Sequence, residues 1–267
     1  MASTESSRAR KRAAEARAAA EAAQNRRQRL INIGIGAVLV VVVVGLVGGA
    51  WWSSGRSGGN IEPSADAVLP QGVLAADSPY AYGVVAAKGA AQGKPVVEIW
   101  EDFQCPACEY FEKVFGETVT EMAKSGDAEV IWRTIAFLDS NIPGQNSKRA
   151  MSAWGCAIDE GKKDEYHEIV FANQPTEGVG WTNDQLISFG AQAGIKGDRF
   201  DPFKQCVVSE TYFGWSVNST DQMRIQGITG TPTVVVNGKK VAFDPSDPDG
   251  DIERLKKAVA EAGAPQS

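Results

Sequence analysis

The chain has 267 residues, of which 43% are hydrophobic and 22% are charged, and this allows one substantial buried core with appended segments. The formal net charge is −6, but residues 1–29 hold eight Lys/Arg against three Glu, a balance of +5 that leaves −11 for the rest. An acidic body argues against a nucleic-acid-binding surface, so no nucleic-acid partner is expected.

An uncharged, mostly aliphatic segment at residues 30–52 follows the basic end. As a helix it would be about 33 Å long, enough to cross a hydrocarbon core of about 30 Å. Trp51 and Trp52 close the segment, where interfacial aromatic residues are expected. The sequence therefore predicts one transmembrane anchor.

Positive charge is concentrated on one side of this segment. Three arginines stand just before it, whereas Arg56 is the only basic residue after it until Lys88. The positive-inside rule then places residues 1–29 in the cytoplasm, as a basic tail, and residues 53–267 outside it, on a single-pass cell-membrane protein. The alternative is a cleaved signal peptide, but the apolar stretch is longer than the roughly 7–15 residues usual there.

After the anchor, residues 53–78 are rich in Ser and Gly and contain two prolines, which is typical of a linker. A folded domain is expected over residues 79–267. Its pattern predicts, in chain order, a strand at 95–100, a helix that follows the two cysteines at 105 and 108 and runs through Met122, a strand at 129–138, a hairpin with an Asn-Gly turn at 230–241, and a helix at 252–262.

A block of helices separates the second strand from the hairpin. Helical spacing predicts them at 147–160, 163–172, 183–193 and about 202–226. The whole order predicts an α/β, thioredoxin-like fold with a helical insertion at about 140–221.

Cys105-Pro106-Ala107-Cys108 directly follows the first strand. Such a pair can be half of a zinc site, a structural disulfide or a redox pair. Zinc needs two more ligands, and neither a second close cysteine pair nor a second histidine is present, so no metal is expected. A disulfide across so small a loop would add little stability.

The position of the pair favours redox chemistry. Pro106 suits the first position of a helix, so Cys105 would lie at a helix N-terminus, where the thiolate is favoured over the thiol. Cys105 is then the attacking cysteine and Cys108 the resolving one. The chemistry needs no cofactor beyond the redox-active disulfide itself.

Thr231-Pro232 opens the predicted hairpin. An ordinary trans turn is one possibility, but thioredoxin folds, which the predicted order of elements resembles, place a cis-proline at this position beside the redox pair. The resemblance then implies a cis bond that turns the Thr231 backbone toward Cys105. Together with Pro106 and Ala107 it would form the active-site loops, and the exposed backbone edge could pair with an extended client chain.

Three stretches of this sequence resemble those of a known protein family. Glu-Asp-Phe-Gln-Cys-Pro-Ala-Cys at 101–108, Gly-Thr-Pro-Thr-Val-Val-Val-Asn-Gly at 230–238 and the helical block between them resemble the DsbA-like thioredoxin family, especially membrane-anchored actinobacterial disulfide-forming oxidoreductases. The resemblance implies oxidation of cysteine pairs in exported proteins. It also implies re-oxidation by a quinone-linked membrane partner that is DsbB-like or VKOR-like.

The sequence departs from the family at two positions. Ala107 stands where the well-studied DsbA has a histidine, and Ile99 stands where thioredoxins have a buried aspartate. Glu98 or Glu101 is a candidate to assist proton transfer instead. Of Glu98, Glu101 and Asp102, two are expected to be solvated.

The other two cysteines, Cys156 and Cys206, are expected to form a structural disulfide, because an even number of cysteines in an exported protein usually pairs. Two buried free thiols are the alternative. His167 is interpreted as a surface or partly buried residue in its helix.

Three functions remain open on the sequence. The first is a dithiol oxidase, the second a reductase or isomerase on the same scaffold, and the third a non-catalytic binding module with a structural disulfide. No dimerisation domain is evident, so a monomer is expected.

Overall fold

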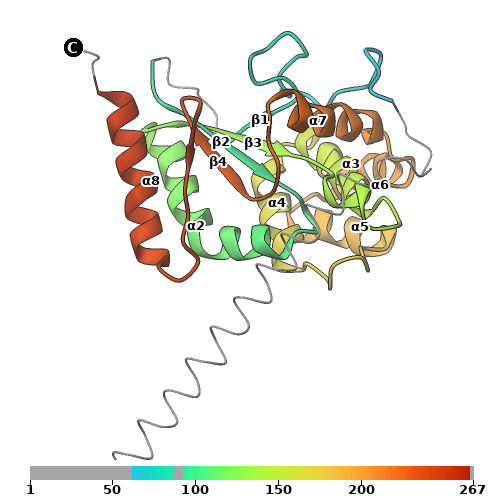
Figure 1. The fold of residues 1–267 in the computed structure, drawn as a ribbon. Coiled ribbons are helices and arrows are strands. Elements are labelled where there is room, and N and C mark those ends of the chain that lie inside the picture. Colours follow the sequence, from blue (N-terminus) through green and yellow to red (C-terminus); the bar gives the residue numbers. More distant parts are fainter. Residues whose placement is uncertain (1–61, 87–92, 265–267) are drawn as a thin grey trace, which may run out of the picture. The chain divides into compact units, whose positions relative to one another are not determined.

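The computed structural model describes residues 62–86 and 93–264 (Figure 1). The predicted cytoplasmic tail at 1–29 and the predicted anchor at 30–52 lie outside the described residues. Within the described ranges, no helix is long and apolar enough to cross a membrane.

A five-stranded sheet forms the centre of the domain, in the order β1-β3-β2-β4-β5. Only β2 and β3 are parallel, and the other neighbours are antiparallel. β2 is the middle strand, and the chain that leaves its end enters the interior of the molecule. The strands are β1 (Val84–Val85), β2 (Val96–Glu101), β3 (Glu129–Thr134), β4 (Thr233–Val236) and β5 (Lys239–Val241).

Two long helices cover the sheet, and the insertion stands to the other side. α2 and α8 lie side by side, whereas the helices of the insertion cluster beyond β3 and β1 (Figure 1). The helices are α2 (Pro106–Ser125), α3 (Asn146–Asp159), α4 (Lys163–Ala172), α5 (Asn183–Gln192), α6 (Phe200–Val208), α7 (Phe213–Ile225) and α8 (Pro248–Gly263). Short 3-10 turns lie at Leu138–Ser140 and Gly197–Arg199.

This arrangement confirms the predicted α/β, thioredoxin-like fold with a helical insertion. The hairpin turns at Asn237 and Gly238, whose positive φ angles of 44° and 79° are those of a tight two-residue turn between antiparallel strands. The predicted long helix at about 202–226 is wrong, because the chain breaks between α6 and α7. Glu210 there has a φ of 50°, which a right-handed helix does not accommodate.

The folded unit starts earlier than the predicted boundary at residue 79. The backbone N–H of Ser64 donates to Asn218 Oδ1 at 2.9 Å, and Asn218 Nδ2 donates to the Ser64 carbonyl at 2.8 Å. Pro70 is buried against Gly155, where an added Cβ would lie 2.9 Å from the proline ring. Residues 62–78, which were expected to belong to the linker, therefore lie against the insertion.

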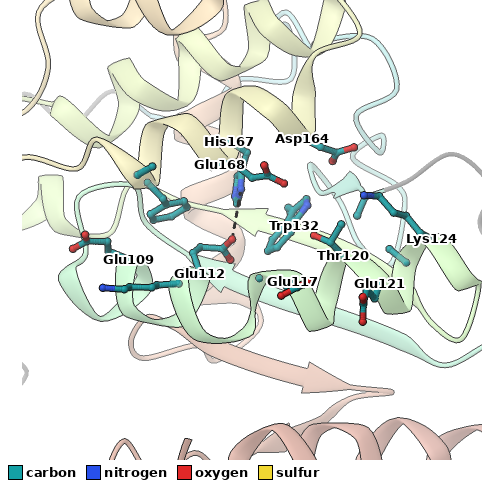
Figure 2. Close-up of a pocket in the computed structure, with 16 residues that line it drawn as sticks. Glu109, Glu112, Glu117, Thr120, Glu121, Lys124, Trp132, Asp164, His167 and Glu168 are labelled. Carbon is teal, nitrogen blue, oxygen red and sulfur yellow. Dashed lines mark ion pairs between the residues drawn. The ribbon is translucent and has the colours of Figure 1, made fainter. Parts of the chain in front are cut away.

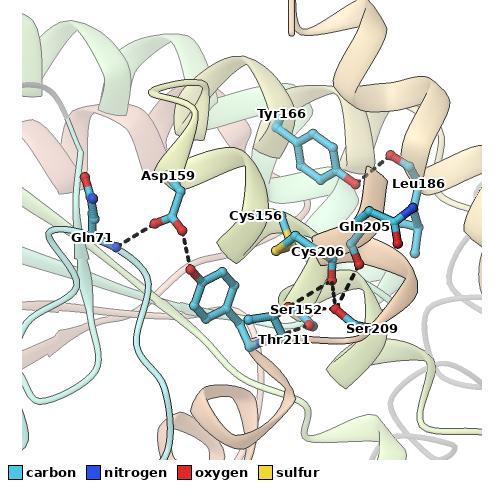
Figure 3. Close-up of a disulfide and its surroundings, with 11 residues drawn as sticks. Gln71, Ser152, Cys156, Asp159, Tyr166, Leu186, Gln205, Cys206, Ser209 and Thr211 are labelled. Carbon is cyan, nitrogen blue, oxygen red and sulfur yellow. Dashed lines mark hydrogen bonds between the residues drawn. A yellow bond between two sulfur atoms is a disulfide. The ribbon is translucent and has the colours of Figure 1, made fainter. Parts of the chain in front are cut away.

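Cys156 of α3 and Cys206 of α6 form a disulfide (Figure 3). The bond closes a sequence separation of 50 residues. Beside it, the Tyr212 hydroxyl donates to Asp159, whose other oxygen accepts the Gln71 backbone N–H at 2.7 Å. The disulfide thus ties two helices of the insertion together, next to the segment that leads into the domain.

Candidate active site

Cys105 lies in the connection between the central strand, β2, and the helix α2. β2 ends at Glu101, and Cys105 is the N-cap of the helix, with extended backbone angles of −77° and 117°. Pro106 fills the first helical position, which needs no hydrogen-bond donor. Cys108 follows one turn later, and its N–H donates to the Cys105 carbonyl at 2.9 Å.

The two free thiols have opposite properties. Cys105 is 8% exposed, and its pKa is lowered to about 7, first by a hydrogen bond from the Cys108 thiol and then by backbone N–H groups of the helix start, against the effect of burial. Cys108 is 0% exposed, and burial raises its pKa well above the usual range. At neutral pH the pair can hold one thiolate and one thiol.

The loop before β4 completes this side of the site. The Thr231–Pro232 peptide bond is cis, and the Cys105 thiol donates to the Thr231 carbonyl at 3.5 Å. Thr231 and Pro232 are half-buried. The structure thus brings the Cys105-Pro106-Ala107-Cys108 segment and the Thr231-Pro232 segment together, although 126 residues separate their contacting members.

Asp102 fixes the turn between β2 and Cys105. It is 0% exposed, and its carboxylate accepts the backbone N–H of Gln104 and of Leu138 at 2.8 Å each, and the Ser147 hydroxyl at 2.6 Å. Burial raises the pKa of Asp102 to about 7, against these hydrogen bonds. The aspartate therefore joins the active-site turn to the start of α3.

A second buried group of charges lies on the other side of the turn. Glu101 is 0% exposed. Its Oε1 accepts a hydrogen bond from the Thr134 hydroxyl at 3.1 Å and is also hydrogen-bonded to His167 Nε2. His167 Nδ1 lies 3.9 Å from Glu112 Oε2 on α2. Burial alone would lower the pKa of His167, but the Glu101 carboxylate outweighs it and raises the pKa to about 9. Burial, then repulsion from Glu101, raises the pKa of Glu112 to about 8.

Two expectations about these residues are wrong. His167 is only 2% exposed, so it is neither a surface nor a partly buried residue. Glu101 and Asp102 are fully buried, and the Glu98 side chain is 14% exposed and paired with Arg133 at 3.3 Å, so none of the three is solvated. The signal for His167 was present in its spacing, because Val170 and Phe171 follow it at i+3 and i+4 on the buried face of α4.

A cleft of about 700 Å³ opens between α2 and α4, with Trp132 and His167 among its lining residues (Figure 2). It begins at Glu109, the residue after Cys108. Its acidic lining residues are Glu109, Glu112, Glu117, Glu121, Asp164 and Glu168, against the basic Lys113 and Lys124. In the parts of the chain that the structure describes, no group of three His, Cys, Asp or Glu side chains is placed to hold a metal ion.

Comparison with known proteins is consistent with this geometry. A family model described as Thioredoxin matches residues 84–260. No curated protein sequence matches the chain.

Solved structures give closer information. The reduced form of a disulfide bond oxidoreductase, DsbG, from Mycobacterium tuberculosis has 28% identity and a TM-score of 0.51 over 72% of this chain and 93% of that one. Oxidised DsbA from the same organism has 29% identity and a TM-score of 0.50 over 69% and 96%. MdbA, a thiol-disulfide oxidoreductase from Actinomyces oris, has 21% identity and a TM-score of 0.56 over 67% and 87%, and this likeness shows the fold alone.

Proposed function

Because the chain belongs to the DsbA-like thioredoxin-fold oxidoreductases and is a thiol-disulfide oxidoreductase, we propose that Cys105 and Cys108 are its redox pair. We further propose that it oxidises cysteine pairs in exported proteins. The observation that carries this proposal is the contrast between the two thiols at the start of α2. One has a lowered pKa and limited exposure, and the other is buried with a raised pKa.

The reaction starts from the Cys105–Cys108 disulfide. A client thiolate attacks Cys105 Sγ, a mixed disulfide forms, and Cys108 leaves and takes up a proton. A second client thiolate then attacks the client sulfur of the mixed disulfide, which releases Cys105 as a thiolate. Two electrons have passed from the client to the domain, and a lowered pKa of Cys105 favours this step because it makes Cys105 a good leaving group.

The loop with the cis Thr231–Pro232 bond supports a role in client binding. Its backbone lies against the attacking sulfur, through the Thr231 carbonyl, and the loop is half-buried rather than covered. An extended client segment could pair with this edge and bring its own cysteine to Cys105. Pro106 and Ala107 would form the opposite wall.

We place the enzyme outside the cytoplasm, held at the membrane by residues 30–52. The one-sided distribution of basic residues around that segment supports this. The Cys156–Cys206 disulfide also fits an oxidising compartment. The reduced pair would return to the disulfide by passing its two electrons to a quinone-linked membrane protein, DsbB-like or VKOR-like.

A trapping experiment tests the site. In Cys108→Ala, the Cys105 thiolate should attack the disulfide of an oxidised client and release one client thiolate, and the mixed disulfide should accumulate because the resolving thiol is gone. Cys105→Ala should trap nothing, and it is the matched control. Mass spectrometry of the non-reduced complex identifies the linked cysteine. Wild-type rates of client oxidation by Cys105→Ala would contradict the assignment of the whole site.

The direction of electron flow has a second candidate. A lowered pKa of the attacking cysteine is common to oxidising and reducing members of this fold, so a reductase is the second candidate. The absence of histidine at Ala107 agrees with this. Equilibration of the pair against glutathione decides between them. A potential nearer to about −120 mV supports the oxidase, and one nearer to about −270 mV supports the reductase.

A further inference from the structure

The turn between β2 and α2 is held by the helical insertion from two sides. On one side, the Ser147 hydroxyl at the start of α3 donates to Asp102 at 2.6 Å and accepts the Gln104 side-chain amide at 2.7 Å. On the other side, the chain that leaves α4 reaches the turn through Gln174. This second contact includes the backbone of the attacking cysteine itself.

Gln174 uses its side-chain amide on the backbone of the turn. Its Nε2 donates to the Phe103 carbonyl at 2.7 Å and to the Cys105 carbonyl at 3.1 Å. An amide nitrogen carries two hydrogens, so one group can serve both acceptors. Gln174 therefore bridges two carbonyls that lie two residues apart, and it does so from about 70 positions further along the chain.

The end of α4 keeps Gln174 in place. The backbone N–H of Gln174 donates to the Phe171 carbonyl at 3.1 Å, and Trp181 Nε1 donates to the carbonyl of the preceding Asn173 at 3.0 Å. The rings of Phe171 and Phe103 pack with their centroids 5.0 Å apart. The end of α4 thus meets the turn through an apolar contact, and Gln174 adds two hydrogen bonds beside it.

The direction of the Cys105 carbonyl affects how the start of α2 faces the sulfur. A carbonyl turns with the ψ angle of its own residue, and this angle is 117° at Cys105. The extended conformation makes Cys105 the N-cap, so that free N–H groups of the first helical turn can stabilise its thiolate. The lowered pKa of Cys105 depends first on the Cys108 thiol, and further on Thr231 and on the N–H groups of Cys108 and Ala107. A rotation at Cys105 would weaken these contacts together.

We propose that Gln174 is a positioning residue of the redox site, which holds the Phe103 and Cys105 carbonyls so that the Cys105 sulfur keeps its place at the start of α2. The inference rests on the proposed role of Cys105 and Cys108 as the redox pair. Gln174 acts through the backbone, because its amide bonds to carbonyl groups of the turn. The helical insertion then tunes the reactivity of the attacking cysteine.

The charged surroundings of Cys105 do not involve Gln174. The titratable groups beside the thiol are Cys108 of α2 and Asp102 of the turn, whereas the loop before β4 presents the uncharged Thr231. Among the described residues, no hydrogen bond joins the Gln174 side chain to Cys108 or Asp102. An uncharged replacement of Gln174 therefore changes the hold on the turn and leaves the charges near the sulfur as they are.

The experiment makes two measurements on the purified full-length protein. The first follows alkylation of Cys105 in the reduced protein against pH, with mass spectrometry to identify the modified cysteine. The second equilibrates the Cys105–Cys108 disulfide with glutathione. The variants are Gln174→Met, which has a similar length and no donor, and Gln174→Glu, which sets a carboxylate against the two carbonyls. The matched control is Asn173→Ala, because the Asn173 side chain bonds within its own helix, to the Ile169 carbonyl at 2.8 Å.

We expect Gln174→Met to slow alkylation of Cys105 by at least about threefold at about pH 6, since one hydrogen bond contributes roughly this factor to an equilibrium. A less stable thiolate also disfavours the reduced pair. At about pH 8, where the thiolate predominates, the glutathione equilibrium should move at least about twofold toward the disulfide, or about 9 mV at about 29.6 mV per tenfold. Gln174→Glu should change both measurements further in the same direction, and Asn173→Ala should match the wild type.

Gln174→Glu has the size of the natural side chain, so it carries the test if Gln174→Met fails to fold. Wild-type alkylation profiles and glutathione equilibria in the folded Gln174 variants would overturn the proposal, even if these variants unfold in less urea, because the residue would then be only structural. An equal change in Asn173→Ala would also overturn it, since any loosening at the end of α4 would then have the same effect.

Cys105→Ala separates this proposal from the proposed function. It is mixed with a reduced client in parallel with the Gln174 variants. If Cys105→Ala still oxidises the client, the proposed function fails. An inactive Cys105→Ala beside Gln174 variants that behave as the wild type removes the role of Gln174 alone.

Discussion

At the scale of single residues, three buried groups hold their protons more tightly than they do in an unfolded chain. The pKa of Asp102 is raised to about 7 by burial, that of Glu112 to about 8 by burial and Glu101, and that of His167 to about 9 by Glu101 against burial. In an unfolded chain, carboxyls titrate near pH 4 and imidazole near pH 6.5. Between about pH 4 and pH 9 the folded domain therefore binds more protons than the unfolded one.

This difference predicts that the domain loses stability as the pH rises. The favourable contribution of His167 is complete below about pH 6.5 and is lost as the pH rises through about 9, while the penalty from Asp102 and Glu112 grows between about pH 4 and their raised pKa values. We expect the free energy of unfolding of the oxidised protein to fall by more than about 1 kcal/mol between pH 5 and pH 8, since one pKa unit corresponds to about 1.4 kcal/mol. Urea unfolding at each pH measures it.

The oxidised protein is used because Cys105 and Cys108 do not titrate while they are joined. In the reduced protein, the lowered pKa of Cys105 acts with the opposite sign. Glu112→Gln should flatten the curve, and Glu117→Gln should leave it unchanged. A stability that is constant or rises over this pH range would contradict the assigned burial of these charges.

The residues of the site differ in how far the sequence could predict them. Cys105, Cys108 and Pro232 were found because short local motifs specify a helix start and a hairpin start. The Glu101–His167 contact joins residues 66 positions apart, and it depends on how α4 packs over the end of β2. A single histidine in a helix carries no local signal of its partner. The pairing of Glu101 with His167 could therefore be identified only from the folded structure.

At the scale of elements, the Cys156–Cys206 disulfide is the strongest link within the insertion. It joins α3 to α6 across 50 residues, and in the chain-entropy account a loop of this length contributes about 4 kcal/mol. The double variant Cys156→Ala/Cys206→Ala should lose about this free energy of unfolding, measured in urea. A loss below about 1 kcal/mol would indicate that the helices hold the loop closed without the bond.

The same variant should keep its activity at low temperature. Cys156 lies near the end of α3, whereas the contact of α3 with the active-site turn is made by Ser147, at its start. We expect the rate of client oxidation to stay within about twofold of the wild type while the protein is folded, since distant sites act almost independently. A larger loss would show that the disulfide also positions the turn that Asp102 fixes.

Elements were predictable where local chemistry and tertiary packing agree. The Asn237-Gly238 turn and α4 are set by their own residues, and both came out as predicted. The break between α6 and α7 was missed because the segment keeps helical spacing on both sides of it. The early start of the domain was missed because the bonds between Ser64 and Asn218 and the contact of Pro70 with Gly155 are tertiary.

At the scale of the whole molecule, the chain combines an acidic domain with a basic, apolar N-terminal part. The described domain carries the proposed redox pair and a disulfide in the insertion, and both need an oxidising compartment if the domain is to act as an oxidase. The apolar residues 30–52 and the basic residues before them are what would deliver it there and hold it. The proposed function therefore requires a defined orientation in the membrane.

This orientation can be tested in cells. Protease added to intact spheroplasts should digest the domain and leave a short N-terminal fragment, because residues 53–267 are expected outside the cytoplasm. A cytoplasmic protein probed in the same sample should survive, and lysed cells should lose both. Release of the undigested domain into the medium would instead favour cleavage after residues 30–52, as in a signal peptide. Protection of the domain in intact spheroplasts would show that the orientation is the opposite of the expected one. An oxidase of exported proteins would then lack access to its clients.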